Sequence, residues 1–331
     1  MHTDDTDLSI VRRRVGAGFV YHDRSGRRVS DEKTLARIRS LAIPPAYRDV
    51  RICRLANGHL QAIGRDARHR KQYRYHPDWR RLREHGKFAR MREFGLQLPA
   101  LRRRLRRDLA LAGLPRERVL AVVVSLLGQT LARIGNEEYR RQNGSFGLTT
   151  LRDRHLAFLR GGRVRLRFRG KSAQSQEIVV DDAKLTRLLH RCRELPGQRL
   201  FQYRDDDGRV QSVDSGLVND YLREAMGASF TSKDFRTWGA SVLALRALAA
   251  TPLPRRHSET DFARAMAPAV REVAGVLGNT ATVCRNSYVH PAVFEAWRSG
   301  SLPEVAEFAG WSGGERLLLR VLRAPPRRRA R

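Results

Sequence analysis

The sequence predicts an α+β fold, with a small β-rich N-terminal part and a larger, mainly helical part after it. Between residues 18 and 76, short apolar segments are bounded by turn-forming residues, which is typical of short strands. Beyond residue 89, apolar residues recur mainly with helical spacing, and one segment alternates apolar and basic residues as a short β-hairpin does. We therefore expect domains at residues 1–88 and 89–323, followed by a basic tail at 324–331.

The composition points to a polyanionic partner. The chain has 331 residues, of which 41% are hydrophobic, enough to bury a core. Lys and Arg number 65 against 34 acidic residues, a net charge of +31. Such self-repulsion destabilises a compact chain unless a polyanion relieves it, so nucleic acid is the first candidate and an anionic membrane surface the second. Arginine outnumbers lysine, which suits bidentate contact with phosphate and guanine.

Several other classes of protein find no support in the sequence. Cys53, Cys192 and Cys284 are far apart and have no zinc-site spacing. There is no nucleotide-binding glycine loop and no acidic cluster suited to magnesium. The polar N-terminus lacks a signal sequence, and the longest apolar run, 119–127, is too short to span a bilayer. We expect a cytoplasmic protein that binds no metal or cofactor.

In the N-terminal part, strands are expected at 18–21 and 59–63, a helix at 31–41, and turns that include residues 64–66. Residues 65–75 (RDARHRKQYRY) mix basic and aromatic side chains most densely. They could form an exposed basic loop followed by a strand with surface tyrosines. We favour a DNA contact, in which cations hold the backbone while Gln72, Tyr73 and Tyr75 reach sugars or base edges.

The C-terminal part is expected to begin with a basic helical stretch at 79–91 that joins the domains. A helix at 98–111 would carry Pro99 in its first turn, and a long helix would run from 115 to 139. Arg133 lies at the end of its buried run and could be either a structural ion-pair partner or a rigidly held functional cation. Further helices are expected at 183–192, 215–226, 235–250, 261–277 and 304–323.

Two further segments carry candidate chemistry. Residues 164–168 and 177–180 predict a hairpin with Lys171 at its tip, either a solvated turn lysine or a proton donor. Between 278 and 291, Tyr288 follows Asn279 by nine positions, with Arg285 between them. A tyrosine hydroxyl can attack a phosphodiester if nearby cations stabilise the added negative charge. Taken alone, this pattern is a weak indication.

Four separated segments together resemble one family. Residues 131–139, 168–172, 231–238 and 277–288 resemble, in order and spacing, the type IB DNA topoisomerases of the bacterial and poxvirus-like branch. Residues 71–76 and 144–150 resemble the same branch, and the similarity covers about residues 12–291. The resemblance implies the fold of topoisomerases IB and tyrosine recombinases, with relaxation of supercoiled DNA through transient single-strand cleavage, strand rotation and religation, without ATP or metal.

The resemblance also implies a role for each matched residue. Tyr288 would form a 3′-phosphotyrosine, Arg133 and Arg236 would stabilise the transition state, and Lys171 would protonate the 5′-oxygen. Asn279 stands where many members have histidine; we expect it to donate a hydrogen bond to a phosphate oxygen. The residues expected to contact DNA are Gln72, Tyr73, Tyr75, Tyr139 and Lys233.

By the same resemblance, the two domains would close around double-stranded DNA as a clamp hinged near residues 79–91. We expect a monomer, since no heptad seam or exposed apolar repeat suggests assembly, and we expect it to be associated with the nucleoid. One alternative is a tyrosine site-specific recombinase. Those enzymes typically have histidine three residues before the second arginine, where this chain has Lys233. The other alternative is a non-catalytic DNA-binding protein, which would leave the ordered set of catalytic residue types unexplained.

Overall fold

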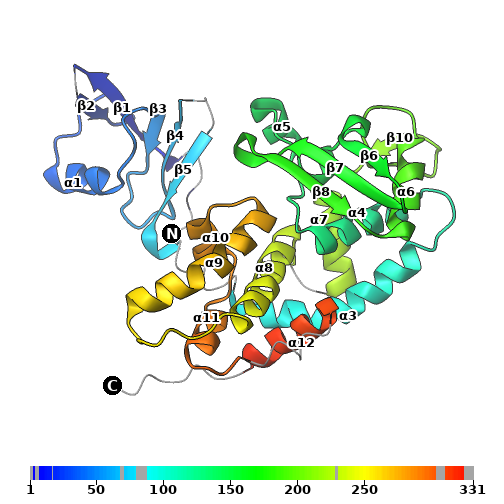
Figure 1. The fold of residues 1–331 in the computed structure, drawn as a ribbon. Helices are drawn as coiled ribbons and strands as arrows, with labels where there is room; N and C mark the ends of the chain where they lie inside the picture. Colours follow the sequence, from blue (N-terminus) through cyan, green and yellow to red (C-terminus); the bar gives the residue numbers. More distant parts are fainter. Residues whose placement is uncertain are drawn as a thin grey trace. The chain divides into compact units, whose positions relative to one another are not determined.

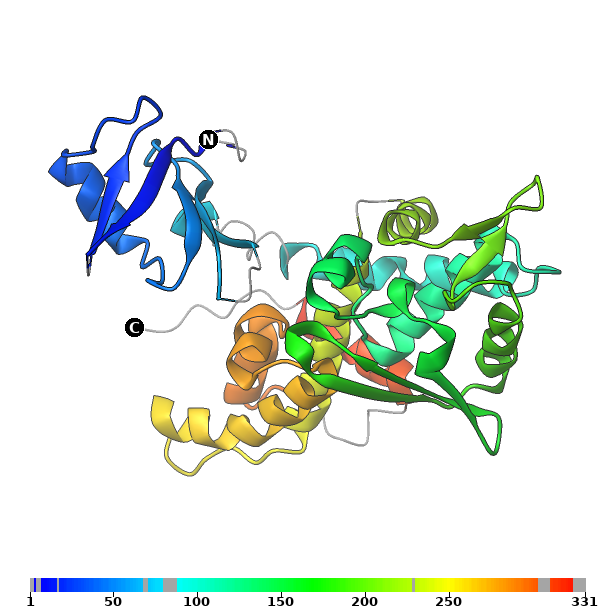
Figure 2. The same cartoon turned by 90° about the horizontal axis from the view of Figure 1, so that it is seen from above.

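The structure is a computed structural model that describes residues 3, 7–16, 18–67, 71–79, 88–227, 230–302 and 310–323. It divides into two compact units, Met1–Gly86 and Lys87–Arg331 (Figures 1 and 2). Most of the helical stretch expected at 79–91, and the whole basic tail expected at 324–331, lie outside the described residues.

The first unit is built on a five-stranded antiparallel sheet in the order β2-β1-β3-β4-β5. Its elements are β1 (Ile10–Val15), β2 (Gly18–His22), α1 (Glu32–Ser40), β3 (Arg48–Ile52), β4 (Leu60–Arg65) and β5 (Lys71–Tyr75). The Asp31 side chain caps α1 by accepting a hydrogen bond from the Thr34 amide. Ile38 of α1 is buried in one cluster with Ile10, Val50 and other apolar side chains of the sheet, so the helix covers its apolar side.

The β-rich character of this part is confirmed, as is the helix predicted at 31–41. Strands β1 and β3 were not predicted, because IVRRRV and RDVRI contain too many charged residues to give a clear alternation. The turn predicted at 64–66 is wrong at its start, since Gly64 and Arg65 belong to β4. Gly64 serves close packing there: a Cβ would lie 3.0 Å from the Val50 side chain.

The second unit is organised around α8 (Ser232–Ala249), whose residues are mostly buried. The helices that contact α8 are α3 (Met91–Asp108), α4 (Arg116–Thr130), α7 (Ser215–Met226), α9 (Glu259–Leu277), α11 (Pro291–Arg298) and α12 (Gly310–Val321). Figure 1 shows α8 running through the middle of the helical region. The Trp238 indole of α8 donates to the Glu315 carboxylate of α12 at 3.1 Å, and Arg102 of α3 pairs with the same carboxylate.

Small sheets and short helices complete this unit. Strands β6 (Leu156–Leu159), β7 (Arg163–Arg169) and β8 (Ser175–Val180) form an antiparallel sheet, and β9 (Gln202–Arg204) pairs with β10 (Val210–Ser212). The remaining α-helices among the described residues of this unit are α5 (Glu137–Asn143), α6 (Ala183–Arg193) and α10 (Ala281–Ser287). The hairpin predicted from residues 164–180 is confirmed as β7 and β8, but β6, β9, β10, α10 and α11 were not predicted.

Of the helices predicted beyond residue 180, those at 183–192, 215–226, 235–250 and 261–277 are confirmed to within a few residues as α6, α7, α8 and α9. For the helix predicted at 304–323, residues 304–309 are outside the described residues, and α12 confirms it from Gly310 to Val321.

The helix expected at 98–111 is wrong at its start, since α3 begins at Met91 and holds Pro99 in its interior. Proline lacks the N–H that would bond to the carbonyl of Gly95. Burial outweighs this loss, because Phe94 packs edge-on against the rings of Phe230 and Phe235 and lies beside the tilted ring of Trp238. The proline was therefore misread as a helix start.

The long helix predicted from 115 to 139 is confirmed as α4 only as far as Thr130 and is wrong beyond it. Leu131 adopts φ 54° and ends α4, and a new helix, α5, begins after Asn136, whose side chain accepts from the Tyr139 amide at 2.9 Å. Residues 131–136 are instead non-helical. Arg133 therefore lies in a connecting segment rather than on a core helix.

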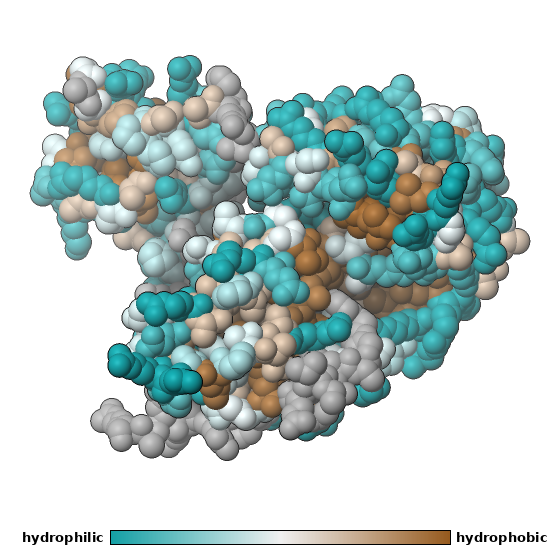
Figure 3. Space-filling view, viewed as in Figure 1, coloured by the Kyte–Doolittle hydropathy of each residue, from teal (hydrophilic) through white to brown (hydrophobic). Residues whose placement is uncertain are grey.

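Hydrophilic residues cover most of the visible face of each unit (Figure 3), as the net charge of +31 requires. Within the described parts of the chain, every helix is too short or too polar to cross a membrane.

We predict opposite stability effects for two glycine-to-alanine changes. A Cβ on Gly95 would lie 2.2 Å from the Trp238 ring, so Gly95→Ala should lower the free energy of unfolding by about 1–3 kcal/mol. A Cβ on the helical Gly275 meets nothing within 4 Å, so Gly275→Ala should raise it by about 0.5–1 kcal/mol. Urea unfolding followed by circular dichroism measures both. Equal effects of the two changes would show that α3 and α8 are not in close contact there.

Candidate active site

Arg236 lies in the first turns of α8, where a capping box of Thr231 and Asp234 starts the helix. It is only 5% exposed. Its guanidinium donates to the carbonyl oxygens of Leu131 and Leu277, the latter at 2.8 Å. The pKa of Arg236 is lowered, first by burial and then by the nearby charge of Arg133, while interaction with Tyr288 opposes the shift. One buried cation thus holds the C-terminal ends of α4 and α9, where helix dipoles favour positive charge.

Arg133 is positioned by backbone contacts of the segment that follows α4. Its carbonyl oxygen accepts the Leu148 amide at 2.9 Å, and the Ile134 carbonyl accepts the Thr149 amide at 2.7 Å. The two segments, 133–135 and 147–149, approach each other closely at glycines. A Cβ on Gly147 would lie 2.6 Å from the Arg133 carbonyl oxygen and from Gly135 Cα. Glycine is therefore required at this crossing to hold the Arg133 backbone.

The Arg133 side chain reaches the same end of α9 that Arg236 holds. Its guanidinium nitrogens lie 3.5 Å from the carbonyl oxygens of Leu277 and Gly278, and one donates to Asn279 Oδ1. Gly278 ends α9 with φ 60°, and the Asn279 amide donates back to the Ala274 carbonyl at 3.0 Å. The Asn279 Nδ2 donor is buried and has no acceptor among the described residues.

Tyr288 lies at the C-terminal end of α10, half-buried, with its amide donating to the Cys284 carbonyl at 2.9 Å. The Arg236 guanidinium carbon is 5.1 Å from the centre of the Tyr288 ring, and the two side chains also interact through the phenol. Ser241 of α8, fully buried, accepts the His290 amide at 2.9 Å, and its oxygen lies 3.4 Å from the Tyr288 carbonyl. Helix α8 therefore fixes both Arg236 and the backbone around Tyr288.

Two titratable neighbours of Tyr288 are poorly suited to proton transfer. Burial lowers the pKa of His290 to about 4, and its Nδ1 is occupied in capping α11 by accepting the Ala292 amide at 3.0 Å. Burial also raises the pKa of the Cys284 thiol to about 11. Both groups are therefore neutral near pH 7.

Lys171 lies at the tip between β7 and β8 and is exposed. Among the described residues, none pairs with its ammonium group. The base of the hairpin is held by the loop that also positions Arg133, since the Phe146 amide donates to the Arg169 carbonyl at 2.7 Å. Residues 146–149 therefore connect the Arg133 segment to the Lys171 hairpin.

The structure thus brings Arg133, Arg236, Asn279 and Tyr288 together, and places Lys171 on a hairpin tied to the same loop. Ser241 was not predicted. The available signal was a serine five positions after Arg236, within the otherwise apolar run 238–245. Within the described residues, no group of three or more His, Cys, Asp or Glu side chains is placed to hold a metal ion.

The expected DNA contacts occupy different places. Tyr139 lies half-buried on α5, and Lys233 is exposed in the first turn of α8. The other three lie on β5 in the first unit, where Tyr73 and Tyr75 stack at 6.1 Å. Gln72 lies on the opposite side of that strand, with its amide donating to Asp66 at 3.0 Å. Tyr73 and Tyr75 can act together on one face, whereas Gln72 cannot join them there.

Comparison with known proteins identifies the family. Residues 76–301 match the family described as eukaryotic DNA topoisomerase I, catalytic core, and residues 18–66 match the bacterial DNA topoisomerase IB N-terminal domain. The chain is 32% identical over 299 residues to DNA topoisomerase 1B of Acanthamoeba polyphaga mimivirus, covering 88% of each sequence. Both matched regions and this relative agree with one family, and the chain belongs to the type IB DNA topoisomerases.

Proposed function

We propose that this protein relaxes supercoiled double-stranded DNA by cutting one strand through Tyr288, allowing rotation, and resealing the strand. The convergence of two guanidiniums and the Asn279 amide beside a half-buried tyrosine carries the proposal. Asn279 Nδ2 is a buried donor without an acceptor in the described structure. Buried donors are rarely left unpaired, and a phosphate oxygen would satisfy this one.

In the cleavage step, the Tyr288 hydroxyl loses its proton to solvent and its oxygen attacks the backbone phosphorus. A P–O bond forms while the bond from phosphorus to the 5′-oxygen breaks. Negative charge grows on the non-bridging oxygens of the five-coordinate transition state. Arg133 and Arg236 supply fixed positive charge there, in a partly buried site where it acts more strongly than in water. Asn279 donates a hydrogen bond to one of the same oxygens.

Lys171 acts as the general acid. The departing 5′-oxygen needs a proton, and an ammonium group on the hairpin tip can supply it. Religation is the same step in reverse: the 5′-hydroxyl attacks the phosphotyrosine, and the tyrosine oxygen leaves. The energy of the phosphodiester is kept in the 3′-phosphotyrosine, so the cycle uses no nucleotide.

We propose further that the enzyme acts as a monomer on DNA, in the cytoplasm and on the nucleoid, with both units contacting the duplex. Tyr139 and Lys233 would serve in the second unit. In the first unit, Tyr73 and Tyr75 would act from one face of β5 and Gln72 from the other. The chain's excess of basic residues favours binding to backbone phosphates, and such binding should weaken steeply with salt.

The direct test is relaxation of supercoiled plasmid by wild type and by Tyr288→Phe, in EDTA and without ATP. Wild type should relax the plasmid, because the proposed site uses only protein cations. The variant should bind DNA with unchanged affinity but produce no relaxed or nicked product, since it lacks the attacking oxygen. Binding by wild type without any nicking would leave a non-catalytic DNA-binding protein as the better account.

The proposed role of Asn279 leads to a separate prediction. Asn279→His should retain relaxation activity, because imidazole also offers an N–H donor at this position. Asn279→Ala should slow single-turnover cleavage by about 10²-fold, the usual effect of removing one transition-state donor. Rates are measured on a short duplex with a single cleavage site. Complete loss of activity in Asn279→His, in a variant that still folds, contradicts the assigned role.

A further inference from the structure

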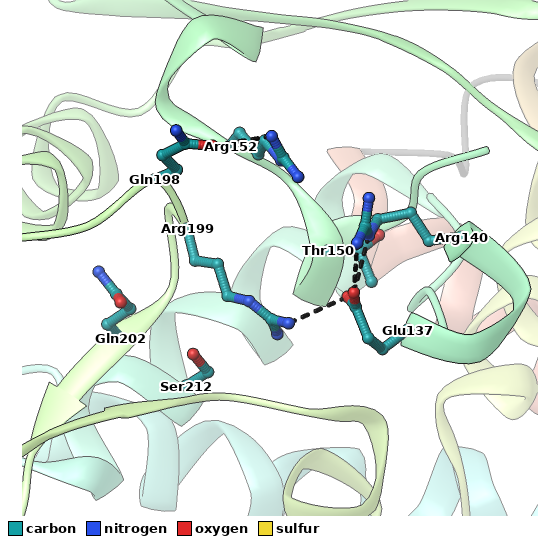
Figure 4. A pocket seen from close by; sticks show the side chains of 8 residues that line it. All are labelled: Glu137, Arg140, Thr150, Arg152, Gln198, Arg199, Gln202 and Ser212. Atoms are coloured by element: carbon teal, nitrogen blue, oxygen red, sulfur yellow. Dashed lines mark hydrogen bonds and ion pairs between the residues drawn. The ribbon is translucent and has the colours of Figure 1, made fainter. Parts of the chain in front are cut away.

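A polar cavity of about 290 Å³ lies next to the loop that holds Arg133 (Figure 4). Its lining residues are Glu137, Arg140, Thr150, Arg152, Gln198, Arg199, Gln202 and Ser212. Thr150 connects it to the active site, because its hydroxyl accepts the Gly147 amide at 2.9 Å and Gly147 packs on Arg133. Glu137 and Arg140 belong to α5, the helix that carries Tyr139.

The cavity has an excess of positive charge. Its lining contains three guanidiniums and one carboxylate, a formal sum of +2. Glu137 is fully engaged, with one oxygen accepting from Arg140 at 2.9 Å and the other 3.2 Å from Arg199. Arg152 donates to the Gln198 side chain at 2.8 Å. These contacts orient Arg152 and Arg199, and each guanidinium keeps further N–H donors for a ligand.

We propose that this cavity binds a backbone phosphate of the duplex outside the cleaved position, with Arg152 and Arg199 as its donors. The proposal rests on the proposed function, since it requires DNA at Arg133 and Tyr139. Guanidiniums held by neighbouring side chains suit a tetrahedral anion. Strand phosphates recur about every 3.4 Å along the duplex axis, so a strand crossing the active site offers flanking phosphates.

The test measures duplex binding across a range of salt concentrations in a Tyr288→Phe background, with Arg152→Gln and Arg199→Gln added singly. Each loss of a phosphate contact should reduce the slope of log affinity against log salt by about one. Arg223→Gln is the matched control, because Arg223 is exposed and pairs with Asp220 away from the cavity. Its slope should stay within error of the background.

Unchanged slopes in both cavity variants would overturn the proposal. Inorganic phosphate at constant ionic strength provides the second arm. If it raises the Tm of the background protein but not of Arg199→Gln, while DNA slopes do not change, the cavity takes a free phosphate instead. Neither result depends on cleavage, so the role of Tyr288 is judged separately.

A second inference concerns Gln176, at the start of β8, which touches the neighbours of two proposed catalytic residues. A Cβ on Gly278 would lie 2.6 Å from Gln176 Nε2, and a Cβ on Gly170 would lie 2.8 Å from its Cγ. Gly278 precedes Asn279 in the chain, and Gly170 precedes Lys171. One side chain therefore packs between the base of the hairpin tip and the end of α9.

We infer that Gln176 is a positioning residue for Lys171. Its aliphatic part supports Gly170 and its amide covers Gly278, so it sets the separation between the hairpin tip and the phosphate-binding end of α9. Gln176→Ala would leave space at this contact and let the Lys171 ammonium drift from the 5′-oxygen. Displacement of a catalytic group by about 1 Å can slow a reaction by about 10²-fold.

The test compares single-turnover cleavage of ordinary DNA with cleavage of DNA whose scissile 5′-oxygen is replaced by sulfur. A thiol has a pKa of about 8.5, so a thiolate leaves without a proton donor. Gln176→Ala should cleave ordinary DNA at least about tenfold more slowly than wild type and the sulfur substrate within about twofold. Gln176→Met, which keeps the length of the side chain, should recover most of the loss.

Gln174→Ala is the matched control. Gln174 holds Gly170 through its backbone carbonyl, at 2.8 Å, and this contact survives truncation of the side chain. Equal slowing of Gln176→Ala on both substrates, or no slowing on either, overturns the inference. Lys171→Ala tests the underlying assignment: if the sulfur substrate fails to rescue it, the general-acid role itself is wrong. If it rescues Lys171→Ala alone, only the role of Gln176 is wrong.

Discussion

The second unit depends on a buried cation that binds two helix ends. Arg236 lies almost entirely out of water and donates to the carbonyl oxygens of Leu131 and Leu277. These carbonyls are at helix C-termini, where they lack partners within the helix and where the dipole is negative. Without this guanidinium the Leu131 carbonyl would be unpaired, at a cost of about 1–3 kcal/mol, and the Leu277 carbonyl would keep only its 3.5 Å contact with Arg133. The same group therefore closes the fold and supplies charge to the proposed site.

The placement of this cation explains why the site favours an anion. Arg133 reaches the Leu277, Gly278 and Asn279 end of α9 close enough to lower the pKa of Arg236. Two partly buried guanidiniums repel each other, and carbonyl dipoles offset only part of that repulsion. A phosphate between them would offset the rest. Because the backbone fixes both arginines beforehand, little reorganisation is needed when negative charge grows in the transition state.

Sequence patterns anticipated the outline of this fold but not the details that position the site. The hairpin around Lys171 and helices α6 to α9 could be predicted because alternation, helical spacing and capping residues agree there. The end of α4 at Leu131 could not be predicted, because this residue lies in an apolar run that looks continuous with the helix. Its φ of 54° goes with a carbonyl that is paired by the distant Arg236. The start of α3 was predicted wrongly from Pro99, because the helix is extended to Met91 by the packing of Phe94 against aromatic rings distant in sequence. Family resemblance, rather than periodicity, linked the separated catalytic residue types.

The proposed catalytic groups differ in how firmly the fold holds them, and the chemistry explains this difference. Arg133, Arg236 and Asn279 are tied to helix ends by buried bonds, whereas Lys171 stands exposed on a hairpin tip. The non-bridging oxygens remain attached to the same phosphorus, which stays in the site throughout cleavage and religation, so their partners can be rigid. The 5′-oxygen leaves with the strand that rotates. Its proton donor must release it and meet it again. A group on an exposed tip is suited to this, because the tip is supported from below by the Arg169 backbone contact and by Gln176 against Gly170.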